Sequence, residues 1–218
     1  MSEGILSVGR RMVACTRHCK GIELAPSRGV LPRSLVLEET NRARSRGSVA
    51  LGINPGTGDD EEETYYREHG CTYEAMLEFW MARRDWSHPY HTRTRRFIDA
   101  IGLAGPILWT ELVKCQNAPG KRGAPPLETL RTCVQLYLVE EVAAVPPDWP
   151  IVAIGKEPYR VATLMFPSRT VIGIPHPTGS YGLFPRLFDK AGGLTEHAER
   201  SVAEALRSPS PAALWTSD

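Results

Sequence analysis

The chain of 218 residues has no long apolar run, no internal repeat and almost no net charge. No apolar stretch approaches the roughly 18 residues that a membrane-spanning helix needs, so we expect no membrane segment. The N-terminal residues lack the apolar core of a secretory signal, and we therefore expect a cytoplasmic protein. A net charge of +1 does not by itself indicate a nucleic-acid partner.

Basic residues are nevertheless unevenly distributed. Residues 1–46 hold nine basic and four acidic side chains, and residues 83–96 hold five arginines against one aspartate. Two such stretches can converge on a DNA backbone, whereas a solvated surface of mixed sign is the alternative, and charge alone leaves both open. The residues that this pattern predicts to contact phosphates are Arg93, Arg95 and Arg96.

The chain has few cysteines, five in all. In a reducing compartment they argue against disulfides and favour metal binding, catalysis or core packing.

Short apolar runs bounded by Gly or Pro alternate with helical patterns along the chain, which predicts an open α/β/α sandwich with a mostly parallel, four-stranded sheet. The predicted strands are Ser48–Ile53, Ile107–Val113, Pro150–Ile154 and Thr170–Ile174. The predicted helices are Thr72–Ala82, Arg95–Ile101, Leu127–Val145, Glu157–Met165 and Glu196–Leu206. The length favours a single domain, 1–207, followed by a loose tail, 208–218.

Two turns at predicted strand ends carry polar side chains. Gly52-Ile53-Asn54-Pro55-Gly56 follows the first strand, and its Asn54 amide can aim a water molecule at a sugar carbon. Pro175-His176-Pro177 follows the last strand, and its rigidly placed His176 can donate to an anionic leaving group. Taken singly, an ordinary turn and a surface histidine explain these motifs as well. Ligands of open α/β folds bind at the carboxyl ends of the strands, where both motifs are predicted to lie. The two motifs together are therefore a candidate binding site.

A third motif runs from Trp109 to Pro119 and contains Val113-Lys114-Cys115. Cys133 follows in the long predicted helix, and Cys15 and Cys19 form a close pair near the N-terminus. Four scattered thiolates suit an iron–sulfur cluster; a zinc site and plain core packing are the alternatives.

The order of these elements resembles the uracil-DNA glycosylase superfamily, and in particular its iron–sulfur branch, family 4. The resemblance covers residues 12–190 and includes the Ile154-Gly155 strand end. It implies a [4Fe–4S] cluster held by Cys15, Cys19, Cys115 and Cys133, the first two supplied by residues 1–46. Three residues separate Cys15 from Cys19, where the family usually has two, and Cys71 has no counterpart.

The resemblance also implies roles for the other motifs. A glycosylase flips its target base out of the DNA stack and hydrolyses the bond to deoxyribose. Asn54 matches the water-positioning residue, with Asp59 as a carboxylate able to share that role, and His176 matches the donor to the departing base. For Asp59 the alternative is that it merely begins a solvated acidic run. For Tyr90 the alternative is that it is an ordinary core residue. Both alternatives remain open. The further predicted DNA contacts are Tyr90 stacking on the base, Gly52 and Ile53 lining its pocket, and Thr178 with Tyr181 or Leu183 near the wedge.

One position departs from the family. Glu111 stands where the family normally has the Asn that recognises uracil. An ionised Glu only accepts hydrogen bonds, and facing O4 of uracil it would lose one, at about 1–3 kcal/mol. The amino group of cytosine is a donor that a carboxylate accepts, and a protonated carboxyl also donates to N3. We therefore expect the excised base to be a modified cytosine foreign to the host, as in the branch that attacks phage DNA carrying glucosylated hydroxymethylcytosine.

Three other functions remain open on the sequence: a uracil-DNA glycosylase with unusual recognition, an inactive iron–sulfur protein that binds DNA, and a hydrolase of small nucleosides. For the glycosylase, the expected partner is DNA, including phage DNA, and the expected state is a monomer.

Overall fold

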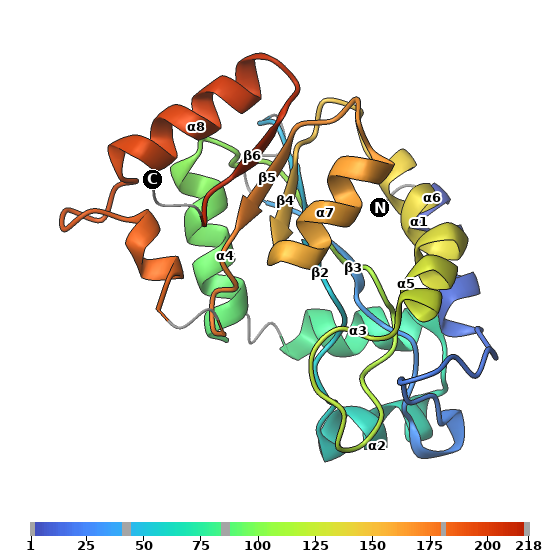
Figure 1. The fold of residues 1–218 in the computed structure, drawn as a ribbon. Coiled ribbons are helices and arrows are strands. Elements are labelled where there is room, and N and C mark those ends of the chain that lie inside the picture. The colour runs from blue at the N-terminus through green and yellow to red at the C-terminus, as the bar shows by residue number, and fades with distance from the viewer. Residues whose placement is uncertain (1–2, 41–44, 84–87, 180–181, 216–218) are drawn as a thin grey trace. The chain divides into compact units, whose positions relative to one another are not determined.

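The protein is an α/β fold built on one six-stranded, mostly parallel sheet (Figure 1), as seen in a computed structural model that describes residues 3–40, 45–83, 88–179 and 182–215. The strand order is β1-β3-β2-β4-β5-β6. The strands are β1 (Leu35–Glu38), β2 (Ser48–Gly52), β3 (Ile107–Glu111), β4 (Ile151–Ile154), β5 (Val171–Ile174) and β6 (Pro211–Ala213). All four strands expected from the sequence are present, and the sheet has two more.

Contacts divide the chain into two compact units, each assembled from three separate stretches, and each is described here by itself. Unit 1 comprises Met1–Val36, Ile53–Arg84 and Thr110–Val145, and unit 2 comprises Leu37–Gly52, Asp85–Trp109 and Pro146–Asp218. The single domain expected from the length stays a prediction.

Unit 2 holds most of the sheet. Strands β2, β4 and β5 are buried along their whole length, which explains their runs of Val, Ile and Leu, and each pairs with the next in parallel. Helix α7 (Lys156–Met165) packs against β4 and β5, and α8 (Glu196–Arg207) packs against β5 and β6 (Figure 1). Helix α4 (Pro89–Ala100) starts six residues before the predicted Arg95, with Pro89 in its first turn.

The prediction of a loose C-terminal tail is wrong for residues 211–213. They form β6, which pairs in parallel with β5, and the Leu214 amide donates to the Gly173 carbonyl at 2.8 Å. The Trp215 ring covers Gly173 and makes an edge contact with Tyr159 at 4.9 Å between centroids. A Cβ at Gly173 would lie 2.3 Å from the Trp215 ring, so only glycine fits there.

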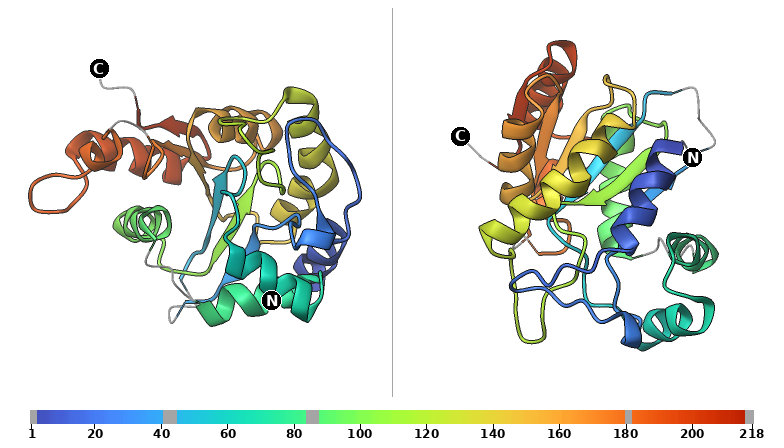
Figure 2. Two further views of the ribbon diagram at one scale, coloured as in Figure 1. Left: turned by 90° about the horizontal axis from the view of Figure 1, so that it is seen from below. Right: turned by 90° about the vertical axis from the view of Figure 1, so that its right-hand side faces the viewer.

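Unit 1 is mainly helical (Figure 2). Its helices are α1 (Glu3–Val13), α2 (Asp60–His69), α3 (Tyr73–Arg83), α5 (Leu127–Cys133) and α6 (Val139–Ala143), with a π-helical stretch at Val134–Leu138. That stretch joins α5 to α6, so the long helix predicted for Leu127–Val145 is present with a local widening. Helix α1 buries Ile5, Val8 and Met12, and it packs against α3 and α6.

The remaining short helices are the 3₁₀ turns Pro26–Arg28 and Phe184–Leu187. Within the described residues, no helix is both long enough and apolar enough to span a membrane.

Candidate functional site

Four of the five cysteines line one pocket in unit 1. Cys15 and Cys19 follow α1, Cys115 follows β3, and Cys133 is the last residue of α5. The space between atoms at this pocket is about 330 Å³, and this volume includes solvent at the open mouth. The rest of its lining is largely apolar and includes Ile22, Pro32, Val113, Leu136 and Tyr137. Segments far apart in the sequence therefore bring the four predicted ligands to one place.

Local hydrogen bonds position the sulfurs. The Cys15 amide donates to the Met12 carbonyl at 3.1 Å, which continues the turn of α1. The Lys114 amide donates to the Cys133 sulfur at 3.4 Å, which ties the long helix to the loop that carries Cys115. Cys115 and Cys133 are buried, and Cys15 and Cys19 are half-buried.

Burial and the neighbouring thiols make Cys115 and Cys133 hard to ionise. Burial raises the pKa of Cys115 well above its usual range, and the neighbouring Cys133, Cys15 and Cys19 raise it further. Burial raises the pKa of Cys133 to about 11, although the Lys114 charge opposes the rise. Thiolates in this pocket need a bound cation to stabilise their charge.

The four cysteines supply a donor set that metals use. Four thiolates are the ligands of a [4Fe–4S] cluster and also of a tetrahedral zinc site. Among the residues that the structure describes, no three His, Cys, Asp or Glu side chains are arranged to hold a metal ion. The chemistry of the four thiols therefore fits a metal group, and it does not distinguish a cluster from zinc.

A fully buried ion pair lies beside the pocket. Lys114 and Glu141 have 0% exposed side chains, and their Nζ and Oε2 atoms are 2.6 Å apart. Lys114 Nζ also donates to Thr110 Oγ1 at 2.6 Å and to the Glu111 carbonyl at 2.7 Å. Glu141 was not among the predicted site residues. A buried lysine in the apolar Val-Lys-Cys motif requires an acidic partner, and this requirement could have directed attention to a glutamate of the long helix.

The predicted water-positioning turn also belongs to unit 1. Asn54 is half-buried directly after β2, and its side-chain amide donates to the Pro55 carbonyl at 3.2 Å. The Val113 amide donates to the Ile53 carbonyl at 2.9 Å, so this turn lies beside the segment that follows β3. Half-buried Glu111 is the last residue of β3, whereas Gly52 ends β2 and is buried.

Asp59 has a local structural role. It is the N-cap of α2, and its carboxylate accepts a hydrogen bond from the Glu62 amide at 2.8 Å. The cap, rather than the acidic run in general, explains an aspartate at this position.

Unit 2 brings Tyr90 and His176 together. Tyr90 is in the first turn of α4, His176 follows β5, and their ring centroids are 5.4 Å apart. His91 lies 5.1 Å from Tyr90 and 4.8 Å from Trp109, measured between ring centroids. These four rings form what we call the aromatic cluster. His91 was not among the predicted site residues, and Trp109 was predicted only as the first residue of a motif.

The histidines of the aromatic cluster are neutral at neutral pH. Burial lowers the pKa of His176. Burial also lowers the pKa of His91 to about 4, with help from the nearby charges of Arg95 and His88. The Thr178 amide donates to His176 Nδ1 at 3.3 Å, which places the ring proton on Nε2. Thr178 thus orients the histidine. Thr178 was predicted to lie near the DNA wedge, and its contact with the histidine was not predicted.

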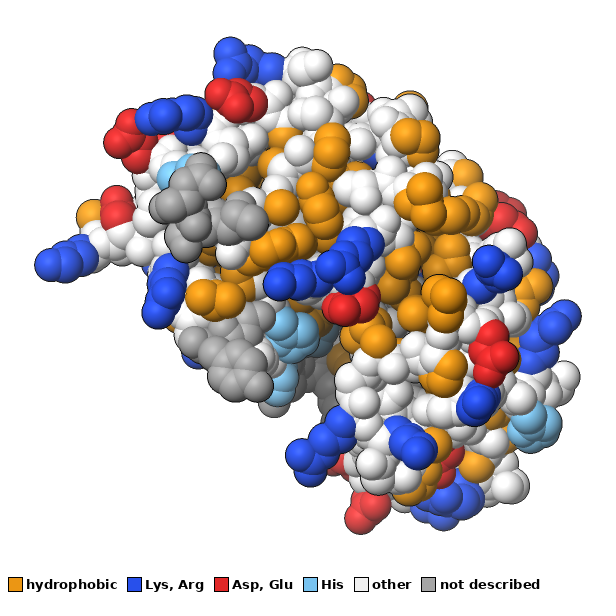
Figure 3. Space-filling model, viewed as in Figure 1, with side chains coloured by type: hydrophobic (Ala, Val, Ile, Leu, Met, Phe, Trp, Pro, Cys, Tyr) orange, Lys and Arg blue, Asp and Glu red, His pale blue; other side chains and the backbone are white. Residues whose placement is uncertain are grey.

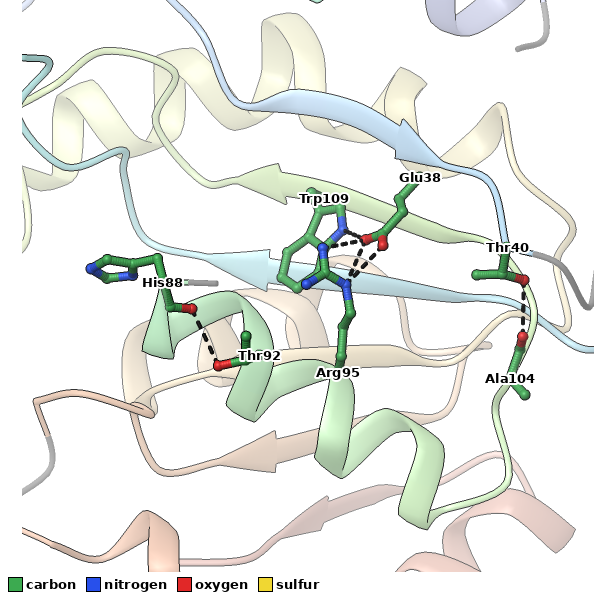
Figure 4. A network of polar contacts seen from close by, with 7 residues as sticks. All are labelled: Glu38, Thr40, His88, Thr92, Arg95, Ala104 and Trp109. Atoms are coloured by element: carbon green, nitrogen blue, oxygen red, sulfur yellow. Dashed lines mark hydrogen bonds and ion pairs between the residues drawn. The ribbon is translucent and has the colours of Figure 1, made fainter. Parts of the chain in front are cut away.

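The three arginines predicted to contact phosphates have protein partners. Arg95 pairs with Glu38 at 2.8 Å, and Trp109 Nε1 donates to the same carboxylate at 2.6 Å (Figure 4). Arg93 donates to the Pro177 carbonyl at 2.6 Å, and Arg96 lies over the Phe188 ring and donates to the Gly192 carbonyl. On the face seen in Figure 3, basic and acidic side chains are interspersed. Tyr181 lies outside the described residues.

No family model matches the chain, and no curated protein matches it. Asn54, Asp59, Glu111 and the cysteines belong to unit 1, and His176, Tyr90 and the arginines belong to unit 2.

Proposed function

We propose that the protein is a DNA glycosylase of the uracil-DNA glycosylase superfamily that carries an iron–sulfur cluster and removes a modified cytosine. The observation that carries the proposal is the pocket lined by Cys15, Cys19, Cys115 and Cys133, which the N-terminal segment, the loop after β3 and the long helix of unit 1 supply. The ordered motifs of the superfamily come from the same segments and from the ends of β2 and β5.

The cluster would be held by those four cysteines. When bound, it would supply the positive charge that keeps the four thiolates ionised, and it would cross-link the N-terminal segment, the loop after β3 and the long helix. Its absence would leave the pocket with thiols whose ionisation burial opposes, as the raised pKa of Cys115 indicates.

The histidine supports the departure of the base. In hydrolysis, the oxygen of water bonds to C1′ of the sugar as the water loses a proton, the bond from C1′ to the base breaks, and the base leaves as an anion that takes up one proton in its place. Neutral His176, with its proton on Nε2, donates a hydrogen bond to that anion without bringing a cation into the site. Tyr90, next to His176, provides a ring on which a flipped base stacks.

Asn54 and Glu111 have the other two roles. The Asn54 amide oxygen holds the attacking water, while its amide nitrogen donates to the Pro55 carbonyl and thereby fixes the orientation of the group. Glu111 accepts a hydrogen bond from the exocyclic amino group of a cytosine. Lys114 holds the Glu111 backbone through the hydrogen bond to its carbonyl.

Base release from defined DNA tests the proposal. Purified protein is incubated with oligonucleotides containing uracil, cytosine or hydroxymethylcytosine and with glucosylated phage DNA, and free bases and abasic sites are measured. We expect release from the modified-cytosine substrates, and no abasic sites from N54A or H176A proteins that still bind DNA. Release from uracil-DNA alone would identify a uracil glycosylase, and no release from any substrate would leave only a DNA-binding protein.

Exchanging the recognition residue sharpens the test. E111N restores the amide that the family uses to recognise uracil, so we expect it to gain release of uracil and to lose release of modified cytosine. E111Q is the matched variant that changes only one atom of the carboxylate. A wild-type preference that survives both changes would place base selection elsewhere.

The metal is identified separately. Iron, acid-labile sulfide and zinc are determined in the purified protein, together with its visible absorbance. We expect about four irons and four sulfides per chain and a brown solution. C115S should lose the iron, whereas C71S, which changes the cysteine outside the pocket, should retain it. Zinc alone would contradict the cluster.

A further inference from the structure

The Asn54 turn, which we define as residues 53–59, is joined to the loop 113–116 that carries Cys115 by three polar contacts, all within unit 1. The first is the backbone hydrogen bond from Val113 to Ile53. The other two use buried side chains, those of Arg33 and Gln116, that neither the motifs nor the proposed chemistry includes.

Arg33 makes the second contact. Its side chain belongs to a residue only 3% exposed, and its backbone amide donates to the Lys114 carbonyl at 2.7 Å. The guanidinium donates to the Gly56 carbonyl and forms an ion pair with Glu62 at 3.3 Å. Pro32, directly before it, lines the cysteine pocket. One residue therefore contacts both the loop that carries Cys115 and the Asn54 turn.

Gln116 makes the third contact, immediately after Cys115. It is 1% exposed, its Oε1 accepts from the Gly58 amide at 2.9 Å, and its Nε2 donates to Glu23 at 2.9 Å. The Glu23 amide donates back to the Gln116 carbonyl at 2.9 Å. The amide group is thus satisfied at both ends by fixed partners.

The turn also rests directly on the Arg33–Glu62 pair. A Cβ at Gly58 would lie 3.1 Å from Glu62 Oε2 and 3.5 Å from an Arg33 nitrogen, so the backbone approaches the pair closely. A buried polar network of this kind has one arrangement that satisfies all its members, and a shift of either segment would leave buried groups unpaired.

We propose that Arg33 and Gln116 are positioning residues that fix the Asn54 turn on the Cys115 loop, so that order in the cysteine pocket determines the placement of the turn. The catalytic meaning of that placement rests on the proposed function; the mechanical connection does not. The cysteine pocket then controls the attacking water through the fold, without touching DNA.

Amide hydrogen exchange in the peptide covering the turn tests the connection without any substrate. R33M/E62Q removes the ion pair and leaves no buried charge unpaired, and Q116M removes the contact with Gly58. We expect each to accelerate exchange in the turn at least tenfold. R10M/E74Q, which removes an exposed Arg–Glu pair of the same unit, should leave it unchanged. Unchanged exchange in both test variants would overturn the proposal.

Transmission from the pocket is tested with C115S and C71S. Cys115 lies between Lys114 and Gln116, which make two of the three contacts, so we expect C115S to accelerate exchange in residues 53–59 and C71S, outside the pocket, not to. Normal exchange in C115S would show that the pocket and the turn are independent.

Activity measurements separate positioning from stability. We expect R33M/E62Q to lower the single-turnover rate at least tenfold, with iron content and DNA affinity within twofold of the wild type, and R33K to fall between. A rate unchanged at temperatures where the variant is folded would show that the pair only stabilises. A wild type that makes no abasic sites would sink the proposed function, and the exchange experiment would still decide the positioning.

Discussion

The two units hold their candidate functional groups by different means. Unit 1 uses buried ions: both side chains of the Lys114–Glu141 pair are 0% exposed, and those of Arg33–Glu62 are 4% and 7% exposed. Unit 2 relies on the packing of aromatic rings and on an ion pair that is partly exposed to solvent. Its Arg95–Glu38 pair is 20% exposed on both sides, and the aromatic cluster depends on ring packing, with Trp109 Nε1 donating to the Glu38 carboxylate.

The difference predicts how each unit fails. Removing one member of a buried ion pair leaves a charge in a medium that cannot solvate it, so the loss of folding stability is large. Packed neutral rings lose stability in smaller steps, because neighbouring groups relax and water reaches the edge. We therefore expect unit 1 to be intolerant of single changes to its buried polar side chains. We expect unit 2 to be more sensitive to pH, because burial lowers the pKa of the histidines in its aromatic cluster.

The largest effect is expected at Glu141. E141A leaves the Lys114 ammonium buried without its carboxylate, which should lower the free energy of unfolding by about 3–5 kcal/mol. Denaturant unfolding followed by circular dichroism measures the change. Because the Lys114 amide contacts the Cys133 sulfur, we also expect weaker metal retention.

The preceding residue provides the control. Glu140 pairs with Arg11 at the surface, where their side chains are 54% and 50% exposed. E140A should therefore cost at most about 1 kcal/mol. Similar losses in E140A and E141A would mean that burial does not distinguish the two pairs and would remove the contrast between the units.

The next effect is expected in acid, at His91. Its pKa is about 4 in the folded protein and about 6.5 when unfolded, so the unfolded chain binds the extra proton in that interval. Stability is therefore complete above pH 6.5 and is lost as the pH falls towards 4, by about 3 kcal/mol at most. Denaturant unfolding of wild-type and H91Q proteins across this range measures the difference.

H91Q should flatten the slope of stability against pH, because it removes the group whose pKa folding lowers. An equally steep slope in H91Q would assign the acid sensitivity to groups outside the aromatic cluster.

Elements whose side chains alternate or cluster by polarity were predictable from the sequence. The apolar runs of β2, β3, β4 and β5 are buried on both faces, and such strands have a local pattern. Helix α2 was missed because only Glu62 and Tyr66 of its ten residues are buried, so it has almost no apolar stripe. Strand β6 was missed because Pro211 begins it, and its pairing with β5 is a tertiary contact.

For the candidate site, the residue types were predictable and most of their partners were not. The resemblance implied a common site for four of the cysteines, and all four line one pocket. The arginines of residues 93–96 had the composition of a phosphate-binding stretch, but Arg95 instead meets Glu38, which is 57 residues away in the chain. No local pattern specifies such a pairing. The same holds for Arg33, whose three partners come from three other segments.

The smallest effect, at Asp59, decides between two roles of one carboxylate. D59A removes the N-cap of α2 and should cost about 1 kcal/mol, similar to T195A at the N-cap of α8 in unit 2. D59N keeps an oxygen that accepts from the Glu62 amide, so its stability should match the wild type. If capping is the only role, D59N also keeps the rate of base release. A D59N protein of normal stability and lowered rate would show that the carboxylate charge takes part in positioning the water, because only the charge has changed.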